Sequence, residues 1–151
     1  MNRDLIRAFE KQINLEFSSS YDFFIMSTKF RAIFMEIFSK RFERIAIQKI
    51  NLAKKLCNYL ILREEKFNFF SVDENHCAQK NVSDIFLRAE FQQKLLYGEM
   101  KKLSKLSAQV GDFRAYQFLE EIISKFYFCT SCKSNNLNKE AFEVCTHFDR
   151  A

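Results

Sequence analysis

The sequence contains no proline and only two glycines among its 151 residues, Gly98 and Gly111. Because proline and glycine interrupt helices most strongly, few internal breaks are expected. A fold of several short strands would need many more turn signals than two glycines and a few Asn and Ser provide. The composition therefore predicts an all-α protein, and its 48% apolar residues, which include 19 Phe, are enough to fill one core.

The sequence also lacks a membrane-spanning segment and the cysteine pattern of a secreted protein. No run of about 20 apolar residues is present. The first residues mix Asp4 and Glu10 with basic side chains, unlike a signal or transit peptide. Five cysteines, an odd number, fit reduced thiols better than a disulfide framework. We therefore expect no membrane partner and a cytoplasmic location.

Apolar residues at helical spacing predict four long helices in a single domain. The expected helices cover about residues 3–30, 35–63 and 113–126, with a third helix between the cap at Asn81 or Ser83 and the link at Gly111. The inward set of the third helix is Phe86, Ala89, Gln93, Leu96, Met100 and Leu103. Residues 64–82 form a polar connection. Two parallel helices of roughly 40 Å cannot be joined by a tight turn, so this connection is expected to cross the length of a bundle.

One carboxylate interrupts the apolar pattern of the first helix. The predicted stripe is Ile6, Phe9, Ile13, Phe17, Ser20 and Phe24. Glu16 lies on the edge of this stripe. A carboxylate near a core must be paired, protonated or bound to a cation, because desolvating it alone costs several kcal/mol. Glu16 is therefore either a salt-bridged edge residue or a metal ligand.

The stretch Ile13-Asn14-Leu15-Glu16, followed by Ser20-Tyr21, closely resembles the first helix of the ferritin family. Residues 53–56 and 112–126 also resemble that family, and the resemblance covers about residues 3–128 of the domain 1–151, with a divergent tail at 129–151. It implies an up-down-down-up four-helix bundle with a long crossover. It further implies iron storage in a hollow shell, with self-association or co-assembly with other ferritin subunits. This resemblance is the only reason to expect iron as a ligand.

In the family, Glu16 would be the first ligand of a di-iron ferroxidase site, but the other ligand positions have changed. The resemblance places Phe23 at the nearby Tyr, Lys49 at the bridging Glu, Leu52 at the His, Gln93 at the Glu of the third helix, and Tyr127 at the Gln of the fourth. Binding and oxidising Fe(II) needs several oxygen donors and an imidazole. The sequence therefore predicts a degenerate ferroxidase site with no catalytic residue.

Lys49 continues the apolar stripe of the second helix and allows two interpretations. It can form a buried pair with Glu16, which would fill the old metal position with a fixed positive charge. Alternatively, its ammonium can extend past the apolar surface to solvent.

Two other family sites also look weakened. Storage ferritins line the cavity face of the second helix with carboxylates, and the matching positions here are Lys40, Arg44, Ile47, Gln48, Asn51 and Lys54. Such a face attracts anions rather than ferric ions, or it is simply a solvated helix surface. At the family's three-fold pore the chain offers Gln117 and Glu120, so one of two carboxylates is lost.

The C-terminal residues depart furthest from the family. Residues 140–148 are predicted to form a short fifth helix. Cys129, Cys132, Cys145 and His147 have the residue types of a Cys3His zinc site, but only one Cys-x2-Cys pair is present. Free thiols are the other interpretation.

A net charge of +5 permits a second class of function, a basic helical bundle that binds nucleic acid or protein without an iron role. Lys101, Lys102 and Lys105 would contribute to such a surface, although no nucleic-acid motif accompanies them. Within the family, exposed Phe67, Phe69 and Phe70 in the crossover would instead suit a shell interface.

Overall fold

The computed structural model describes residues 1–71 and 81–127. Four α-helices are followed by one π-helical turn: α1 (Arg3–Ala32), α2 (Glu36–Leu62), α3 (Val82–Gln109), α4 (Phe113–Ile122) and η1 (Ile123–Tyr127). The described residues contain no strand. The all-α prediction and the approximate helix bounds are therefore confirmed.

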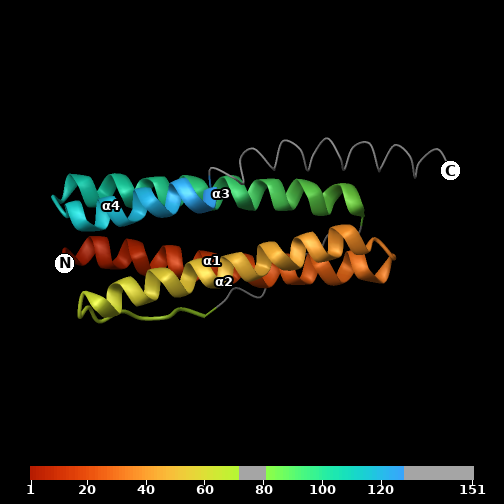
Figure 1. Cartoon of the computed structure of the whole chain (residues 1–151), viewed down its shortest axis with the longest axis horizontal. Coiled ribbons are helices and arrows are strands. Elements are labelled where there is room, and N and C mark those ends of the chain that lie inside the picture. Colours follow the sequence, from red (N-terminus) through yellow and green to blue (C-terminus); the bar gives the residue numbers. More distant parts are fainter. Residues whose placement is uncertain (72–80, 128–151) are drawn as a thin grey trace.

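The helices form an up-down-down-up bundle (Figure 1). α1 and α2 make one antiparallel pair and α3 and α4 make another, while α2 and α3 run in the same direction. The first part of the crossover returns along the α1–α2 pair. It is held to α1 by the backbone N–H of Asn68, which donates to Glu10 Oε1 at 2.7 Å, and by Phe69, whose ring centroid lies 6.3 Å from that of Phe17. The predicted long crossover is therefore present.

Side-chain caps and one left-handed glycine set the helix ends. Asn81 Oδ1 accepts from the backbone N–H of Asp84 at the start of α3, as predicted. Gly111, with φ of 76°, lies in the turn after α3, where a side chain would be strained. Asp112 caps α4 and also pairs with Arg63 at 3.0 Å, which joins the end of α2 to the start of α4.

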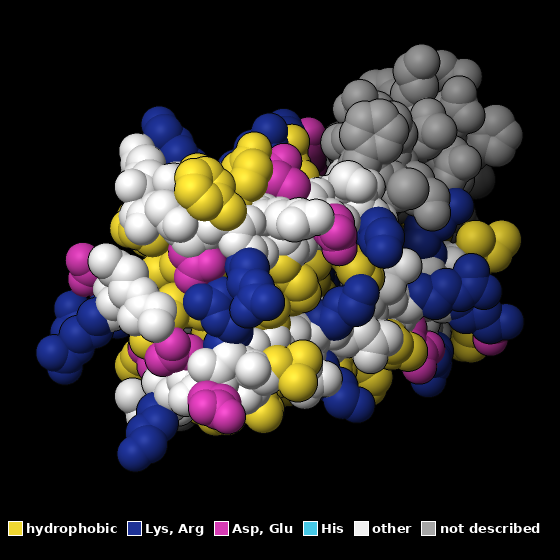
Figure 2. All heavy atoms as spheres, turned by 60° about the vertical axis from the view of Figure 1, so that its left-hand side comes forward, with side chains coloured by type: hydrophobic (Ala, Val, Ile, Leu, Met, Phe, Trp, Pro, Cys, Tyr) yellow, Lys and Arg dark blue, Asp and Glu magenta, His cyan; other side chains and the backbone are white. Residues whose placement is uncertain are grey.

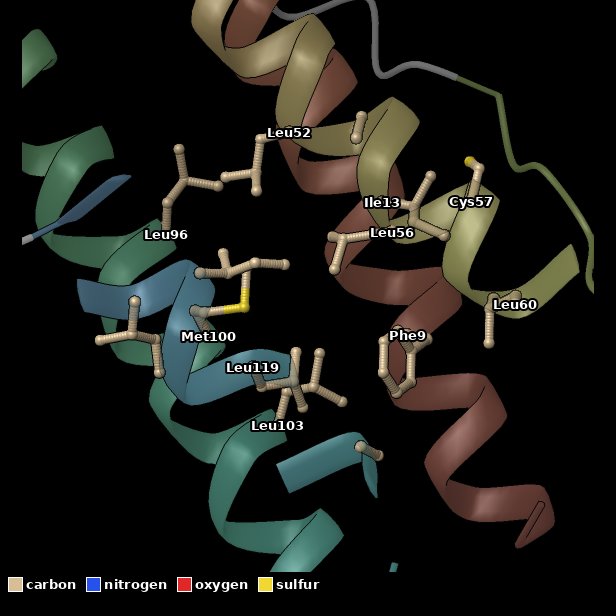
Figure 3. Packing of buried hydrophobic residues seen from close by; sticks show 14 of the residues in the cluster. Phe9, Ile13, Leu52, Leu56, Cys57, Leu60, Leu96, Met100, Leu103 and Leu119 are labelled. Atoms are coloured by element: carbon tan, nitrogen blue, oxygen red, sulfur yellow. The ribbon is translucent and has the colours of Figure 1, made fainter. Parts of the chain in front are cut away.

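Two apolar clusters fill the bundle, and Glu16 and Lys49 lie between them. Figure 3 shows the first cluster, in which leucines from α2, α3 and α4 converge on Phe9 and Ile13 of α1. The second cluster joins α1, α2 and α3 around Phe30, whose ring centroid lies 4.9 Å from that of Phe42. Along α1, Glu16 falls between Ile13 and the second cluster, and along α2, Lys49 falls between the same two clusters.

The buried face of α1 is turned slightly from the predicted stripe. Glu16 is fully buried rather than at the edge, and Phe24, predicted to face inward, is 51% exposed. At both ends the predicted stripe lies one residue past the buried face, with Ile6 in place of Leu5 and Phe24 in place of Phe23, and one residue corresponds to about 100° around a helix of 3.6 residues per turn. The buried set instead includes Phe9, Ile13, Glu16, Ser20, Phe23 and Phe30.

On α3, the prediction that Gln93 belongs to the inward set is only partly right. Its side chain is half-buried, whereas the neighbouring Gln92 is 7% exposed. No helix among the described residues is long and apolar enough to cross a membrane. The expected fifth helix lies outside the described residues, and the single-domain organisation stays a prediction.

Candidate functional site

Glu16 is the centre of a buried polar site formed by three helical segments. Its Oε1 atom accepts one hydrogen bond from Gln12 Nε2 at 3.0 Å and another from the hydroxyl of Tyr127. Gln12 Nε2 also lies 3.4 Å from the carbonyl oxygen of Leu96, so α3 helps to orient it. One carboxylate oxygen is therefore held by neutral donors from α1 and η1.

The other oxygen of Glu16 faces Lys49. The Lys49 ammonium lies 3.8 Å from Glu16 Oε2, and Lys49 is only 5% exposed. Glu16 Oε2 has no hydrogen-bond partner among the described residues, so the pair is an ion pair without a hydrogen bond. The predicted direct contact is therefore present, and the alternative that Lys49 extends to solvent is wrong.

The ammonium of Lys49 also lies 5.0 Å from the ring centroid of Tyr127, within cation–π range. Burial lowers the pKa of Lys49, and the carboxylate of Glu16 opposes that shift. Burial, followed by the charge of Glu16, raises the pKa of Tyr127 far above its usual range. Tyr127 therefore keeps its proton at neutral pH and remains a hydrogen-bond donor to Glu16.

The π-helical turn η1 places Tyr127 in this site. α-Helical geometry ends at Ile122, and a π-turn adds a residue per turn, which rotates the following side chains. The ring of Tyr127 then packs against Tyr97 of α3, with centroids 5.7 Å apart. Sequence reasoning placed Tyr127 at a ligand position, but it did not predict the π-turn or the bond to Glu16.

The remaining ligand-type positions supply few metal donors. Phe23 and Leu52 are buried in the two apolar clusters. Gln12 contacts Leu96 and Ser19 bonds Gln92, so Glu16 lies level with Gln93 on α3. The Oε1 atom of Gln93 is buried and has no hydrogen-bond partner among the described residues.

These side chains do not fit a di-iron centre. They offer one carboxylate, one amide oxygen, one protonated phenol and an ammonium, whereas Fe(II) binding needs several anionic oxygens and an imidazole. Within residues 1–71 and 81–127 no group of three or more His, Cys, Asp or Glu side chains is arranged to hold a metal ion. The roles predicted for the individual site residues stay predictions.

A second polar layer, which sequence reasoning missed, joins α1 to α3. Ser19 Oγ donates to Gln92 Oε1 at 3.0 Å, and Gln92 Nε2 donates to the buried carboxylate of Asp22. Arg88 Nη2 lies 3.5 Å from the same carboxylate. The signal for this layer was the run of serines before Asp22 in an otherwise apolar helix. Because these polar groups bond one another, the layer fixes how α1 packs against α3.

The predicted mineral-face and pore positions lie on the surface. All six mineral-face side chains of α2 are exposed: Lys40, Arg44, Ile47, Gln48, Asn51 and Lys54. On α4, Gln117 and Glu120 are also exposed, and Glu120 Oε1 accepts from Ser104 Oγ of α3 at 2.6 Å. Their place at a pore stays a prediction. The zinc candidates Cys129, Cys132, Cys145 and His147 lie outside the described residues.

Comparisons with known proteins agree with the fold. A model of the ferritin-like domain matches residues 6–126. An open-pore ferritin from the hyperthermophilic archaeon Archaeoglobus fulgidus has a TM-score of 0.78 at 17% identity, over 99% of this chain and 86% of that chain. A PmFTN variant soaked in iron has a TM-score of 0.84 at 13% identity, over 99% and 93% of the two chains. Curated proteins gave no significant match. Because the domain model covers most of its length, this chain belongs to the ferritin family.

Proposed function

We propose that this chain is a ferritin-family shell subunit that does not oxidise Fe(II), because Glu16, which the resemblance assigns as the first iron ligand, is buried in an ion pair with Lys49. The observation that carries the proposal is the Lys49 ammonium, 3.8 Å from Glu16 Oε2 in the core. A divalent cation about 4 Å from this ammonium would be repelled by on the order of 8 kcal/mol at an effective dielectric constant of about 20. The carboxylate of Glu16, the one retained carboxylate ligand, is therefore already paired with the ammonium of Lys49.

The other contacts of Glu16 support the same proposal. To bind a metal through Oε1, Glu16 would have to weaken its bonds from Gln12 and Tyr127. Hydrogen bonds to a charged group contribute roughly 1.5–3 kcal/mol each. Metal binding would therefore disrupt existing contacts as well as displace Lys49.

Exposed apolar side chains on α1, α2 and the crossover support a role in a shell. Phe24, Ile50, Phe69 and Phe70 are between 45% and 65% exposed, whereas Phe67, which was also predicted to be exposed, packs against the first apolar cluster. Hydrophobic side chains also reach the surface among the charged ones on the face shown in Figure 2. Adjacent exposed apolar side chains, such as those of Phe69 and Phe70, are the kind of surface that protein contacts cover. We therefore propose self-association, or co-assembly with active ferritin subunits, in the cytoplasm.

Aerobic Fe(II) oxidation tests the catalytic part of the proposal. The purified chain should oxidise Fe(II) at the rate of a protein-free control. Combining Lys49→Glu, Leu52→His and Gln93→Glu should restore saturable iron binding, because it returns the missing donors to the positions around Glu16. Lys101→Glu combined with Lys102→Gln is the matched control, since it makes the same change of three charges at exposed positions of α3. Saturable oxidation by the unmodified chain would contradict the proposal.

Size-exclusion chromatography with light scattering tests the shell. The chain alone, or co-expressed with a ferroxidase-active ferritin subunit, should elute as a defined multi-subunit assembly. A monomer under both conditions would contradict a shell role, whether or not the chain oxidises Fe(II).

A further inference from the structure

A row of exposed hydrogen-bond donors runs along the outer face of α2. Lys40, Arg44, Gln48, Asn51 and Lys54 are all exposed, and their spacing of four, four, three and three residues keeps them on one side of the helix, where Ile47 is the apolar side chain among them. At 1.5 Å per residue the row is about 21 Å long. Each of the five polar side chains carries at least one N–H donor, and none is a carboxylate. We call these five residues the α2 donor row.

The positive charges of the α2 donor row have no counter-charge among the residues that the structure describes. Lys40, Arg44 and Lys54 form no ion pair with any described residue, and the neighbouring Glu43 is bound at 3.3 Å by Arg31 of α1.

Several basic side chains elsewhere are paired instead. Lys11 lies 2.6 Å and Lys102 lies 2.7 Å from Glu99, and Lys94 lies 2.9 Å from Glu90. The α2 donor row therefore presents unpaired charge in a line, which attracts anions more strongly than surfaces of alternating sign.

We propose that the α2 donor row binds a linear inorganic polyphosphate. Its three cations and two amides match a chain of closely spaced phosphate oxygens, which accept from lysine, arginine and amide donors. No aromatic side chain belongs to the row, so it lacks the base-stacking platform by which proteins hold single-stranded nucleic acid. A straight, unpaired row favours an extended polyanion over a single phosphate. The inference goes beyond the proposed function and does not rest on it.

Calorimetric titration with a short-chain sodium polyphosphate, at several salt concentrations, tests this proposal. Wild-type protein should bind in a salt-sensitive manner. The triple variant Lys40→Gln, Arg44→Gln, Lys54→Gln should bind roughly tenfold more weakly, and its slope of log affinity against log salt should fall by roughly one for each lost contact. All three substitutions are at exposed positions, and circular dichroism checks that the variant is folded.

A charge-matched triple variant distinguishes a site from general attraction. Lys94→Gln, Lys101→Gln, Lys102→Gln removes the same charge from α3 and should leave polyphosphate affinity within about threefold. Equal losses in the two triple variants would overturn the proposal, because binding would then follow net charge alone. Absence of polyphosphate binding, or tighter binding of oligo-dT than of polyphosphate, would overturn it as well.

Discussion

The buried pair of Glu16 and Lys49 predicts strong, non-additive effects of substitution. In Glu16→Gln, the amide oxygen can still accept from Gln12 and Tyr127, but the buried ammonium of Lys49 loses its counter-charge. Breaking a buried pair in this way costs about 3–5 kcal/mol. In Lys49→Met, the Glu16 carboxylate keeps both hydrogen bonds, so the free energy of unfolding should fall by an amount near the lower end of this range, about 3 kcal/mol.

The double variant should be more stable than either single variant. It removes both charges, keeps the hydrogen bonds to the side chain at position 16 and fills similar volume, so its stability should lie within about 1 kcal/mol of wild type. Urea unfolding followed by circular dichroism measures all four proteins. The coupling energy should then be several kcal/mol, above the 0.5–3 kcal/mol usual for residues in contact.

An exposed ion pair provides the control for this cycle. Lys11 and Glu99 lie 2.6 Å apart, but the Lys11 side chain is 63% exposed. Lys11→Met and Glu99→Gln should therefore couple by less than about 1 kcal/mol. If the stability losses at Glu16 and Lys49 are additive, so that their coupling energy is no larger than that of Lys11 and Glu99, the reasoning that the buried pair is desolvated is refuted.

Three further predictions follow from other contacts. Tyr127→Phe removes the hydroxyl bond to Glu16 and should destabilise the fold by about 1.5–3 kcal/mol at pH 7 in urea unfolding. Because the pKa of Tyr127 is raised in the folded state, the stability of the wild type should fall above about pH 10, where this tyrosine ionises only in the unfolded chain. The variant should lack this contribution to the fall. Although burial opposes it, the bonds from Arg63 hold the pKa of Asp112 below its usual value, so Arg63→Gln should destabilise at pH 7 and the difference from wild type should shrink below about pH 4; a pH-independent difference would contradict this. If Cys129, Cys132, Cys145 and His147 are ordinary side chains, elemental analysis after dialysis should find well under one zinc per chain, and stoichiometric zinc lost in Cys132→Ser would show otherwise.

The helices and the charge pair were predictable because they rest on periodic patterns. The absence of proline left the 3.6-residue periodicity uninterrupted, and the structure places Asn81 at the predicted cap. The resemblance assigned Glu16 and Lys49 to one site, and the cost of desolvating a lone charge made a direct pair one of the two interpretations of Lys49. The structure confirms their contact.

The details of the site depend on tertiary contacts that a single sequence does not encode. The crossover covers one side of α1 through Asn68 and Phe69, while Glu16 is turned fully into the core. The π-turn that ends at Tyr127 has no glycine or proline to mark it. Bonds between polar side chains far apart in sequence, such as Ser19 with Gln92, likewise have no local signal.

Iron-edge anomalous diffraction from crystals soaked in Fe(II) tests the central claim most directly. If Lys49 replaces the metal, the maps should show no anomalous peak beside Glu16, and the Lys49 ammonium should remain next to the carboxylate. An iron peak bound by Glu16, with Lys49 displaced toward solvent, would contradict the account.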